Sequence, residues 1–517
     1  MSRSRRRGAG DPAGRKASRR WEAYLPYVAV VLFLAAALGT FDSALALHGD
    51  NAQFLILGRS LAEGHGLAHV NEPAPSPHTK YPFLFPLFLA LIYSIAPGSV
   101  VAAKIGVTLV GAAAVFGAAR LLPRIGSPWI AYPSVALIAL NPHILESSHE
   151  VMSEIPYLCL TLWALDGFIR WEQGKGEKHL WGAVALAIAS YFVRTVGITL
   201  IGAFLLILVV RKRFRSAVLV GAVFLLCAVP WAVRNSSIGG ESYLRQFSLV
   251  NPYEPEGERI TIGRFLGVRV KENVEKYGTR EIARGLLPTL VPDQRNLPTH
   301  LRVLGAAVSL IVLLGVAGRL ARRPGAMEAY AVVYLLVCLA WPEVWGGLRF
   351  LLPLLPFLAF YGLEGAHTLL QWGGGAAARA GVAAVAIFLL YSAAEADLVM
   401  ANRPPEYPQP WANYMAVADW AKENTPAESV FCVRKPYLFF VTSERRTVVY
   451  LWSHDEDKVF EKLVADGVDY VVIAPISGTT ARYLIPALEK YRDRFEMVLK
   501  VPEPDTFLLR MKKEGEA

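Results

Sequence analysis

Long apolar segments recur along this chain, and they constrain its fold more than any other feature of the sequence. A first segment at residues 24–47 is followed by ten more, at residues 100–120, 128–142, 156–170, 180–192, 196–210, 216–232, 300–318, 327–344, 350–370 and 380–397. A helix needs about 20 apolar residues to cross a hydrocarbon core of ~30 Å. The sequence therefore predicts an α-helical polytopic membrane protein with about eleven transmembrane helices. Composition supports this, because 54% of the 517 residues are hydrophobic and only 19% are charged.

The Lys and Arg residues give the chain a net charge of +10, and they fall in short clusters between the apolar segments. This spacing is typical of membrane topology rather than of nucleic-acid binding. With eleven spans the clusters all fall on one side of the membrane, and they comprise Arg120, Arg124, Arg170, Lys175, Lys178, Arg211, Lys212, Arg213, Arg215, Arg319, Arg322, Arg323 and Arg379. Because cytoplasmic loops collect positive charge, we expect that side, with the basic tail at residues 1–23, to face the cytoplasm.

A shorter apolar stretch at residues 82–96 interrupts the series. It has fifteen residues and contains Pro82 and Pro86, and a helix of that length reaches only about 22 Å. We expect it to lie in the membrane interface or to re-enter the bilayer. Counting it as a full span would place every later basic cluster on the outer side. The first segment, residues 24–47, is expected to be an uncleaved anchor, because no convincing cleavage site follows it.

Three polar loops then face outward, at residues 48–100, 141–156 and 234–299. The first contains DNAQFLILGRSLAEG, in which Phe54 and Leu57 recur at helical spacing opposite Arg59. This pattern predicts an amphipathic helix on the membrane surface. Asp50 would stand at the N-terminus of that helix, close to the bilayer.

The composition changes at residue 401, and residues 401–517 read as a separate soluble α/β domain outside the cytoplasm. Strand-like segments are predicted at residues 429–434, 447–452, 469–474 and 495–501, with helices at residues 411–423, 455–466 and 480–491. This region has no glycine-rich phosphate loop and no nucleophile elbow. We therefore expect it to support the structure or contact the acceptor rather than to carry the chemistry.

The metal-ligating residue types do not form a recognisable site. The four cysteines are scattered, without a CxxC pair, at Cys159, Cys227, Cys338 and Cys432. In the second outward loop, His149, Glu150 and Glu154 form an HExxxE pattern, but its ligands fall on mixed helical faces and it is not a zincin motif. We therefore expect no required cofactor and no metal ligands, with a divalent cation as the less favoured alternative.

Six short segments occur in an order that resembles a known family. In chain order they read DNAQFLILGRSLAEGHGL, TKYPFLFPLFLAL, MSEIPY, VRTVG, PWAVRN and LRFLLPLLPFLAFY. Together they resemble the GT-C glycosyltransferase superfamily, in the bacterial branch akin to protein O-mannosyltransferases and the lipid A aminoarabinose transferase. The resemblance implies a GT-C-like membrane domain over residues 24–400. It also implies an enzyme that moves a sugar from a polyprenyl-phosphate carrier to an acceptor on the outer side.

The resemblance also assigns roles to two residues. An acidic residue in the first outward loop is the catalytic base of that family, and Asp50 matches its position. By residue type alone Asp50 would be a helix cap, so the base role comes from the resemblance. Many members have Asp-Glu here, whereas this chain has Asp50-Asn51, which removes a second carboxylate. A lysine ahead of the interfacial segment contacts the carrier phosphate in the aminoarabinose branch, and Lys80 matches it.

Transfer from a glycosyl phosphate needs a base for the acceptor hydroxyl and cations for the departing phosphate. The outward cations at helix ends are Lys80, Arg194, Arg234 and Arg349. Arg194 lies between two apolar segments, where an unpaired charge is costly, whereas Arg234 fits snorkelling to headgroups equally well. Glu154 is expected to orient the acceptor or to pair with an arginine. His149 and Tyr81 are further candidates for contact with the acceptor, and Tyr81 and Trp345 for stacking on a sugar.

These observations predict a transferase at the outer leaflet of a bacterial plasma membrane, in which Asp50 deprotonates an acceptor hydroxyl. Its partners would be a polyprenyl-phosphate sugar donor, an envelope glycan, lipid or protein acceptor, and the bilayer, with no nucleic acid. A transporter or flippase for lipid-linked sugars is the main alternative. Transporters often carry internal repeats, but the loops at residues 48–100 and 234–299 share no motif. A binding protein whose soluble domain is the active part is the other alternative.

Overall fold

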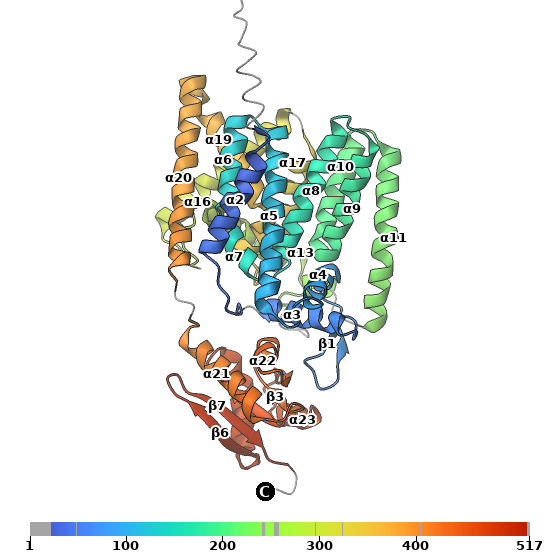
Figure 1. Cartoon of the computed structure of the whole chain (residues 1–517), viewed down its shortest axis with the longest axis vertical. Coiled ribbons are helices and arrows are strands. Elements are labelled where there is room, and N and C mark those ends of the chain that lie inside the picture. Colours follow the sequence, from blue (N-terminus) through green and yellow to red (C-terminus); the bar gives the residue numbers. More distant parts are fainter. Residues whose placement is uncertain are drawn as a thin grey trace, which may run out of the picture.

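The computed structural model describes residues 22–513, apart from residues 48, 240–242, 253–257, 295, 323 and 404–405 and the side chains of residues 243–245 and 372. Residues 1–21 of the basic tail expected at residues 1–23 therefore lie outside the described residues. Arg323 of the basic clusters also lies outside them. The described chain forms a body of long, roughly aligned helices and, beyond one end of it, a smaller domain that contains a sheet (Figure 1).

The long helices of the body coincide with the predicted apolar segments. They are α2 (Leu25–Gly39), α5 (Val100–Ile125), α6 (Pro128–Ala139), α8 (Glu154–Glu172), α9 (Glu177–Val193), α10 (Ile198–Val210), α11 (Phe214–Ile238), α16 (Thr299–Arg322), α17 (Ala326–Ala340), α19 (Leu355–Leu370) and α20 (Gly375–Ala401). A short helix, α18 (Leu348–Leu351), and a 3-10 turn lead directly into α19. By length and composition alone, five helical stretches of the described chain could cross a membrane.

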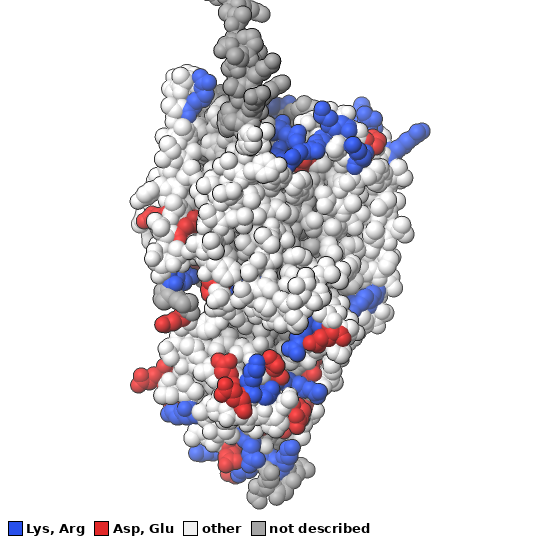
Figure 2. All heavy atoms as spheres, viewed as in Figure 1, with Lys and Arg blue, Asp and Glu red and all other residues white. Residues whose placement is uncertain are grey.

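The surface of the helical body is apolar. On the face shown in Figure 2, a wide band carries few charges, and Lys and Arg gather at the end away from the sheet domain. On α11, for example, Val218 is 70% exposed and Leu226 is 76% exposed. Exposing large apolar side chains along whole helices is favourable in lipid and costs free energy in water. The fold therefore indicates a multi-pass membrane protein.

The first helix ends earlier than its apolar segment predicts. Helix α2 stops at Gly39, and residues 40–47 leave the helical path. Lys104 of α5, which is only 2% exposed, donates hydrogen bonds from its ammonium to the carbonyls of Asp42, at 2.7 Å, and Ala44. A buried ammonium requires such acceptors, and carbonyls within a helix are already occupied. We attribute the non-helical path of residues 40–47 to the carbonyl acceptors that they supply to the Lys104 ammonium.

Two short helices lie across the end of the body that faces the sheet domain, α3 (Gly49–Ala62) and α4 (Leu84–Tyr93) (Figure 1). The stretch expected at the interface thus forms the ten-residue helix α4. The predicted amphipathic helix is present as α3, but it is buried on more than one face, because every residue from Asn51 to Gly58 is buried. Its second face, which the sequence pattern assigns to solvent or lipid headgroups, is covered by the sheet domain.

The remaining segments that the sequence predicts to face outward are short and irregular. A two-stranded hairpin, β1 (Ala68–His69) with β2 (Ser76–Pro77), separates α3 from α4. Helix α7 (Pro142–His149) precedes α8. Between α11 and α16 the described chain forms α12 (Tyr243–Ser248), α13 (Ile262–Arg264), α14 (Lys271–Lys276) and α15 (Ile282–Leu286), and wide π-helical turns over Phe265–Val270 and Tyr277–Glu281 flank α14. These segments form one wall of the site described below.

The C-terminal domain is built on a mixed five-stranded sheet in the order β4-β3-β5-β7-β6. Its strands are β3 (Val430–Cys432), β4 (Arg446–Val448), β5 (Tyr470–Ile473), β6 (Phe495–Val501) and β7 (Thr506–Met511), and its helices are α21 (Gln409–Asn424), α22 (Pro436–Ser443), α23 (Glu456–Ala465) and α24 (Ile485–Lys490). Strand β3 is parallel to β4 and β5, whereas β7 is antiparallel to β5 and β6. The four predicted strands are present, and β7 and α22 were not predicted.

The sheet domain is attached to the first outward loop. Ala52 of α3 is fully buried in the same apolar cluster as Tyr414 and Phe439 of the sheet domain. Asn71 in the hairpin loop exchanges hydrogen bonds with Thr447 of β4, since its carbonyl accepts from the Thr447 amide at 2.7 Å and its side chain donates to the Thr447 hydroxyl at 3.2 Å. The two parts of the molecule thus share a core at α3.

Helices α16 and α19 approach each other so closely that their backbones touch. A Cβ placed on Gly365 of α19 would lie 1.9 Å from the carbonyl oxygen of Ile311, and one placed on Gly315 of α16 would lie 2.0 Å from that of Tyr361. Glycines permit this approach in membrane helix pairs. Because α18 leads directly into α19, this helix crossing also fixes the position of the residues at the start of α18 relative to α16.

We predict that Gly365→Ala destabilises the protein by about 1–3 kcal/mol, because the new methyl group must push α16 away from α19. Thermal unfolding in detergent would measure the loss. Gly202→Ala on α10 is the matched control, since no atom lies within 4 Å of its Cβ position. An equal unfolding temperature for the two variants would contradict the close contact.

Candidate active site

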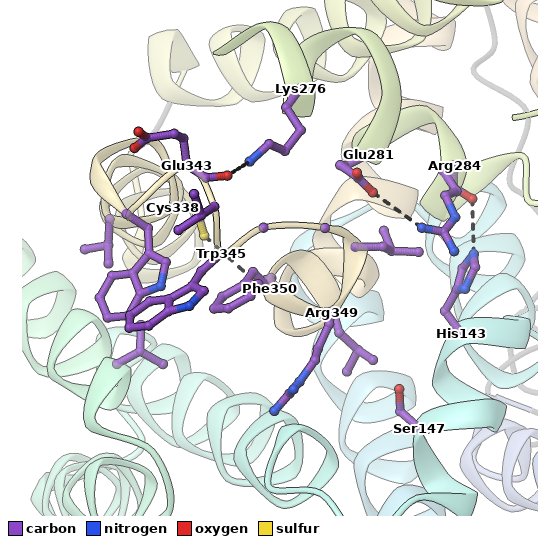
Figure 3. Close-up of a pocket in the computed structure, with 18 of the residues that line it drawn as sticks. His143, Ser147, Lys276, Glu281, Arg284, Cys338, Glu343, Trp345, Arg349 and Phe350 are labelled. Atoms are coloured by element: carbon purple, nitrogen blue, oxygen red, sulfur yellow. Dashed lines mark hydrogen bonds and ion pairs between the residues drawn. The ribbon is translucent and has the colours of Figure 1, made fainter. Parts of the chain in front are cut away.

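A cavity of about 1490 Å³ lies at the end of the helical body that faces the sheet domain. Its walls come from α3, the segment before α4, α7, the break between α9 and α10, the irregular segments before α16, and residues 341–352. Figure 3 shows part of its lining, with Arg349 and Phe350 below Lys276, Glu281 and Arg284. The cavity thus combines residues from all three outward loops that the sequence indicates.

Asp50 lines this cavity from the first turn of α3. Its Oδ1 accepts a hydrogen bond from the Tyr81 hydroxyl at 2.8 Å, and its Oδ2 accepts from both terminal nitrogens of Arg349, each at 3.1 Å. The Asp50 side chain remains 36% exposed. A carboxylate can accept about four hydrogen bonds, so Oδ1 retains room for one more donor from the cavity.

The charge state of Asp50 follows from these neighbours. Burial raises the pKa of the Asp50 carboxyl, but the charges of Arg349 and Lys80 and the hydrogen bonds from Tyr81 and Arg349 outweigh burial and lower that pKa below its ordinary value. Asp50 is therefore a carboxylate at neutral pH, with the capacity to accept a proton.

Behind Arg349, a buried carboxylate joins two arginines. Glu154 has a side chain only 2% exposed, and its Oε1 accepts hydrogen bonds from Nε of Arg349 and from Nη1 of Arg194, the latter at 2.7 Å. Arg194 also donates to the Ser153 hydroxyl at 3.0 Å. The result is a continuous chain of charges, Asp50–Arg349–Glu154–Arg194, in which the two arginines reach the cavity and Glu154 does not.

Local backbone features place these side chains. Glu154 stands in the first turn of α8, where the helix dipole favours an anion. Arg194 lies in the extended break between α9 and α10, and the 3-10 turn that follows ends at Gly197, whose Cβ would lie 2.4 Å from the Tyr191 amide nitrogen. Arg349 follows Gly347, whose φ of 112° favours glycine. Both arginines are thus held at helix breaks.

Lys80 reaches the cavity from the segment before α4, where its ammonium lies 5.1 Å from the centre of the Tyr81 ring. This segment is fixed by His78, whose Nε2 accepts from the Tyr81 amide at 2.6 Å. Burial, with the nearby charges of His69, Lys80 and Arg234, lowers the pKa of His78 to about 3, so its ring is neutral. Its Nδ1 therefore carries the proton and donates to Nε2 of His69 at 3.0 Å.

Besides Glu154, two of the predicted site residues do not line the cavity, Arg234 and His149. Arg234 donates to the His78 carbonyl at 3.0 Å and lies over the Trp231 ring, so it holds the Lys80 segment from behind. His149 is only 4% exposed and packs edge-on against Phe41. Burial and the nearby Lys104 charge lower the pKa of His149 to about 4, so it is a neutral packing residue.

The cavity also has a second polar wall that the sequence did not reveal. Lys276 donates to the Glu343 carbonyl at 2.8 Å, and Arg284 lies 3.0 Å from the Asp293 carboxylate. Trp341 and Trp345 line the same region with ring centroids 6.2 Å apart. Of these residues, the sequence indicated only Trp345. The dense charges of KENVEK and REIAR, unusual beside apolar spans, were the one available signal.

Metal-ligand types do not gather in the part of the chain that the structure describes, where no three His, Cys, Asp or Glu side chains form a cluster suited to a cation. Asn51, beside Asp50, is buried and donates to the Ala46 carbonyl at 2.9 Å. Its side chain thus fixes the residue 40–47 segment. The described cysteines are all free thiols.

Known structures share this fold. ArnT from Cupriavidus metallidurans in the apo state has a TM-score of 0.58 at 12% identity over 95% of this chain and 98% of that chain. ArnT from the same organism bound to undecaprenyl phosphate has a TM-score of 0.57 at 12% identity, with 95% and 97% covered. The Archaeoglobus fulgidus oligosaccharyltransferase in complex with Zn and sulfate has a TM-score of 0.54 at 13% identity, with 94% and 73% covered.

The similarity spans both parts of the molecule, and these structures are GT-C superfamily glycosyltransferases. At such low identity they show the fold alone, so the predicted resemblance is confirmed as a GT-C-like fold. No protein-family model and no curated protein sequence matches the chain significantly.

We predict that Glu154→Gln destabilises the protein by about 3–5 kcal/mol, because it leaves the two arginines without their shared counter-charge. Chemical unfolding in detergent would measure this change. Glu272→Gln serves as the control, since Glu272 lines the same cavity but is exposed. Equal stability of the two variants would show that Glu154 does not hold the arginines.

Proposed function

We propose that this protein is a membrane glycosyltransferase that moves a sugar from a polyprenyl-phosphate donor to an acceptor in the cell envelope. The observation that carries this proposal is the carboxylate of Asp50, half-exposed in a large cavity and flanked by Lys80 and Arg349. A base beside two cations is what transfer from a glycosyl phosphate requires. The undecaprenyl phosphate bound in the ArnT structure of the same fold supports a polyprenyl-phosphate donor here.

In the proposed mechanism, Asp50 accepts the proton of an acceptor hydroxyl while that oxygen attacks the sugar and the bond to phosphate breaks. Attack opposite the leaving group inverts the anomeric carbon. Lys80 and Arg349 neutralise the phosphate as it departs, because arginine and lysine both bind phosphate oxygens. Arg194 adds a third positive charge to the cavity, where its ion pair with Glu154 holds it in place. Arg234 and His78 hold Lys80 in position.

Arg349 links donor binding to the strength of the base. Its terminal nitrogens bind Asp50, while its Nε binds Glu154. A donor phosphate would compete for those terminal nitrogens and release Asp50. Since the Arg349 charge lowers the pKa of Asp50, its release raises that pKa and makes Asp50 the stronger base. The base would thus be activated only when the donor is present.

We further propose that about eleven helices span the membrane, with residues 24–400 as the membrane domain and residues 401–517 as an extracytoplasmic domain. The Lys and Arg side chains that gather at the end opposite the sheet domain support this orientation, since positive charge marks the cytoplasmic side. The cavity then opens at the outer leaflet of a bacterial plasma membrane. Envelope glycan, lipid and protein are the acceptor classes that could reach it there.

We propose that the transfer needs no cofactor. Positive charge at the leaving phosphate comes from Lys80 and Arg349, and the side chain next to the base is an amide, Asn51, that donates to a backbone carbonyl. A divalent cation would require carboxylate ligands beside Asp50.

We predict that Asp50→Asn lowers the transfer rate roughly 10²- to 10⁴-fold, the range for loss of a general base. Mass spectrometry of polyprenyl-linked sugars and envelope glycans from wild-type, deletion and variant strains would test this. Both mutant strains should accumulate one donor lipid and lose one sugar from a glycan. If the deletion changes the profile and Asp50→Asn matches wild type, transport of a lipid-linked sugar becomes the better interpretation.

We also predict that Tyr81→Phe shifts the acidic limb of the kcat/KM profile to higher pH. The Tyr81 hydroxyl stabilises the charged form of Asp50, so its loss raises the pKa of that carboxyl. The base then becomes protonated at a higher pH, and activity falls earlier as the solution is acidified. Tyr450→Phe in the sheet domain is the control. An acidic limb that stays in place or moves downward would contradict Asp50 as the base.

A further inference from the structure

One lysine of the sheet domain lies beside the first turn of α3. Lys435 follows β3 and directly precedes α22, and its ammonium nitrogen is 4.0 Å from the Cβ position of Gly49. Its backbone is fixed on both sides by Tyr414, whose hydroxyl donates to the Lys435 carbonyl at 3.1 Å and accepts from its amide at 3.3 Å. Because the Lys435 backbone is held by these two hydrogen bonds, its side chain has a restricted position beside Gly49, the residue before Asp50.

The Lys435 ammonium makes no salt bridge with a described residue. It is half-buried, and no described carboxylate lies within ion-pair distance of it. Other lysines of this domain are exposed and paired, such as Lys422 with Glu444 at 2.8 Å and Lys500 with Asp505 at 2.7 Å. Because a partly buried charge without a partner is costly, Lys435 is poorly explained as a surface lysine.

The electrostatic surroundings of Lys435 include the candidate base. Burial and the neighbouring Arg434 charge lower the pKa of Lys435, and the Asp50 carboxylate opposes that change. Lys80 is likewise without a described ion-pair partner and lies close enough to Asp50 to lower its pKa. Two such ammonium groups, one from each part of the molecule, therefore stand near the same carboxylate. Neither makes a salt bridge with a described carboxylate.

We propose that Lys435 binds the phosphate of the polyprenyl donor together with Lys80, so that the sheet domain completes the donor site. This inference rests on the proposed function and names a new residue for its donor. The donor phosphate is a diester and the polyprenyl phosphate released on transfer is a monoester, and both present free oxygens to separate cations. The sheet domain, which the sequence assigns to support or acceptor contact, would then be required for donor binding.

The test uses the full chain in nanodiscs titrated with undecaprenyl phosphate, with binding followed by native mass spectrometry. Lys435→Ala should weaken binding about tenfold, the loss of one charge-assisted hydrogen bond. Lys435→Arg should restore most of it, because the cation is retained. Lys458→Ala is the matched control in the same domain, since Lys458 is 67% exposed and pairs with Asp455.

The unfolding temperature without ligand separates binding from a structural role. An unpaired, half-buried ammonium costs stability in the empty protein, so Lys435→Ala should leave that temperature unchanged or raise it. A lower temperature for Lys435→Ala, with unchanged affinity, would show a structural lysine and overturn the inference. A parallel titration with inorganic phosphate distinguishes the source. Loss of affinity for the lipid alone assigns a lipid phosphate, and equal loss for both assigns a general phosphate site.

The outcomes also separate this inference from the proposed function. If wild type binds undecaprenyl phosphate and Lys435→Ala binds it equally well, the role of Lys435 is refuted and the transferase proposal stands. If wild type does not bind the lipid, the donor proposal itself fails, and the role of Lys435 fails with it.

Discussion

A single buried carboxylate, Glu154, holds the candidate site together. Its two arginine partners come from different helix breaks, Arg194 after α9 and Arg349 at the start of α18. Neither arginine is tolerable at this depth without an anion, and one carboxylate satisfies both. Because Arg349 in turn holds Asp50, the position of the candidate base on α3 depends on a residue of α8 that never reaches the cavity.

Helix α3 is the second junction on which the molecule depends. It packs against α4 on one side, where a Cβ on Gly58 would lie 2.7 Å from the Cβ of Leu89, and against the sheet domain on the other through Ala52. The same helix therefore carries Asp50, packs against α4 and anchors the sheet domain. Chemistry and domain assembly share one element of only 14 residues, so neither can change without affecting the other.

The sequence predicts the helices of the body well, because apolar length is a strong and local signal. It also predicts that Asp50, Lys80, Arg194 and Arg349 share one place, since charges at helix ends collect on one side of the membrane. It could not predict which arginine faces which carboxylate, because ion pairing joins residues far apart in the chain. His149 shows the limit of such prediction, because its place in a predicted outward loop did not indicate that it would be buried against Phe41.

The shared core at α3 also bears on the order in which the protein matures. Helix α3 is made early in synthesis, whereas Tyr414 and Phe439, which enclose its Ala52, are made near the end. Until those residues fold, one face of the helix that bears Asp50 is uncovered and its first turn lacks Lys435. A partly synthesised or truncated chain therefore has its helical body but an uncovered α3, and the surroundings of Asp50 are complete only after the last domain has folded.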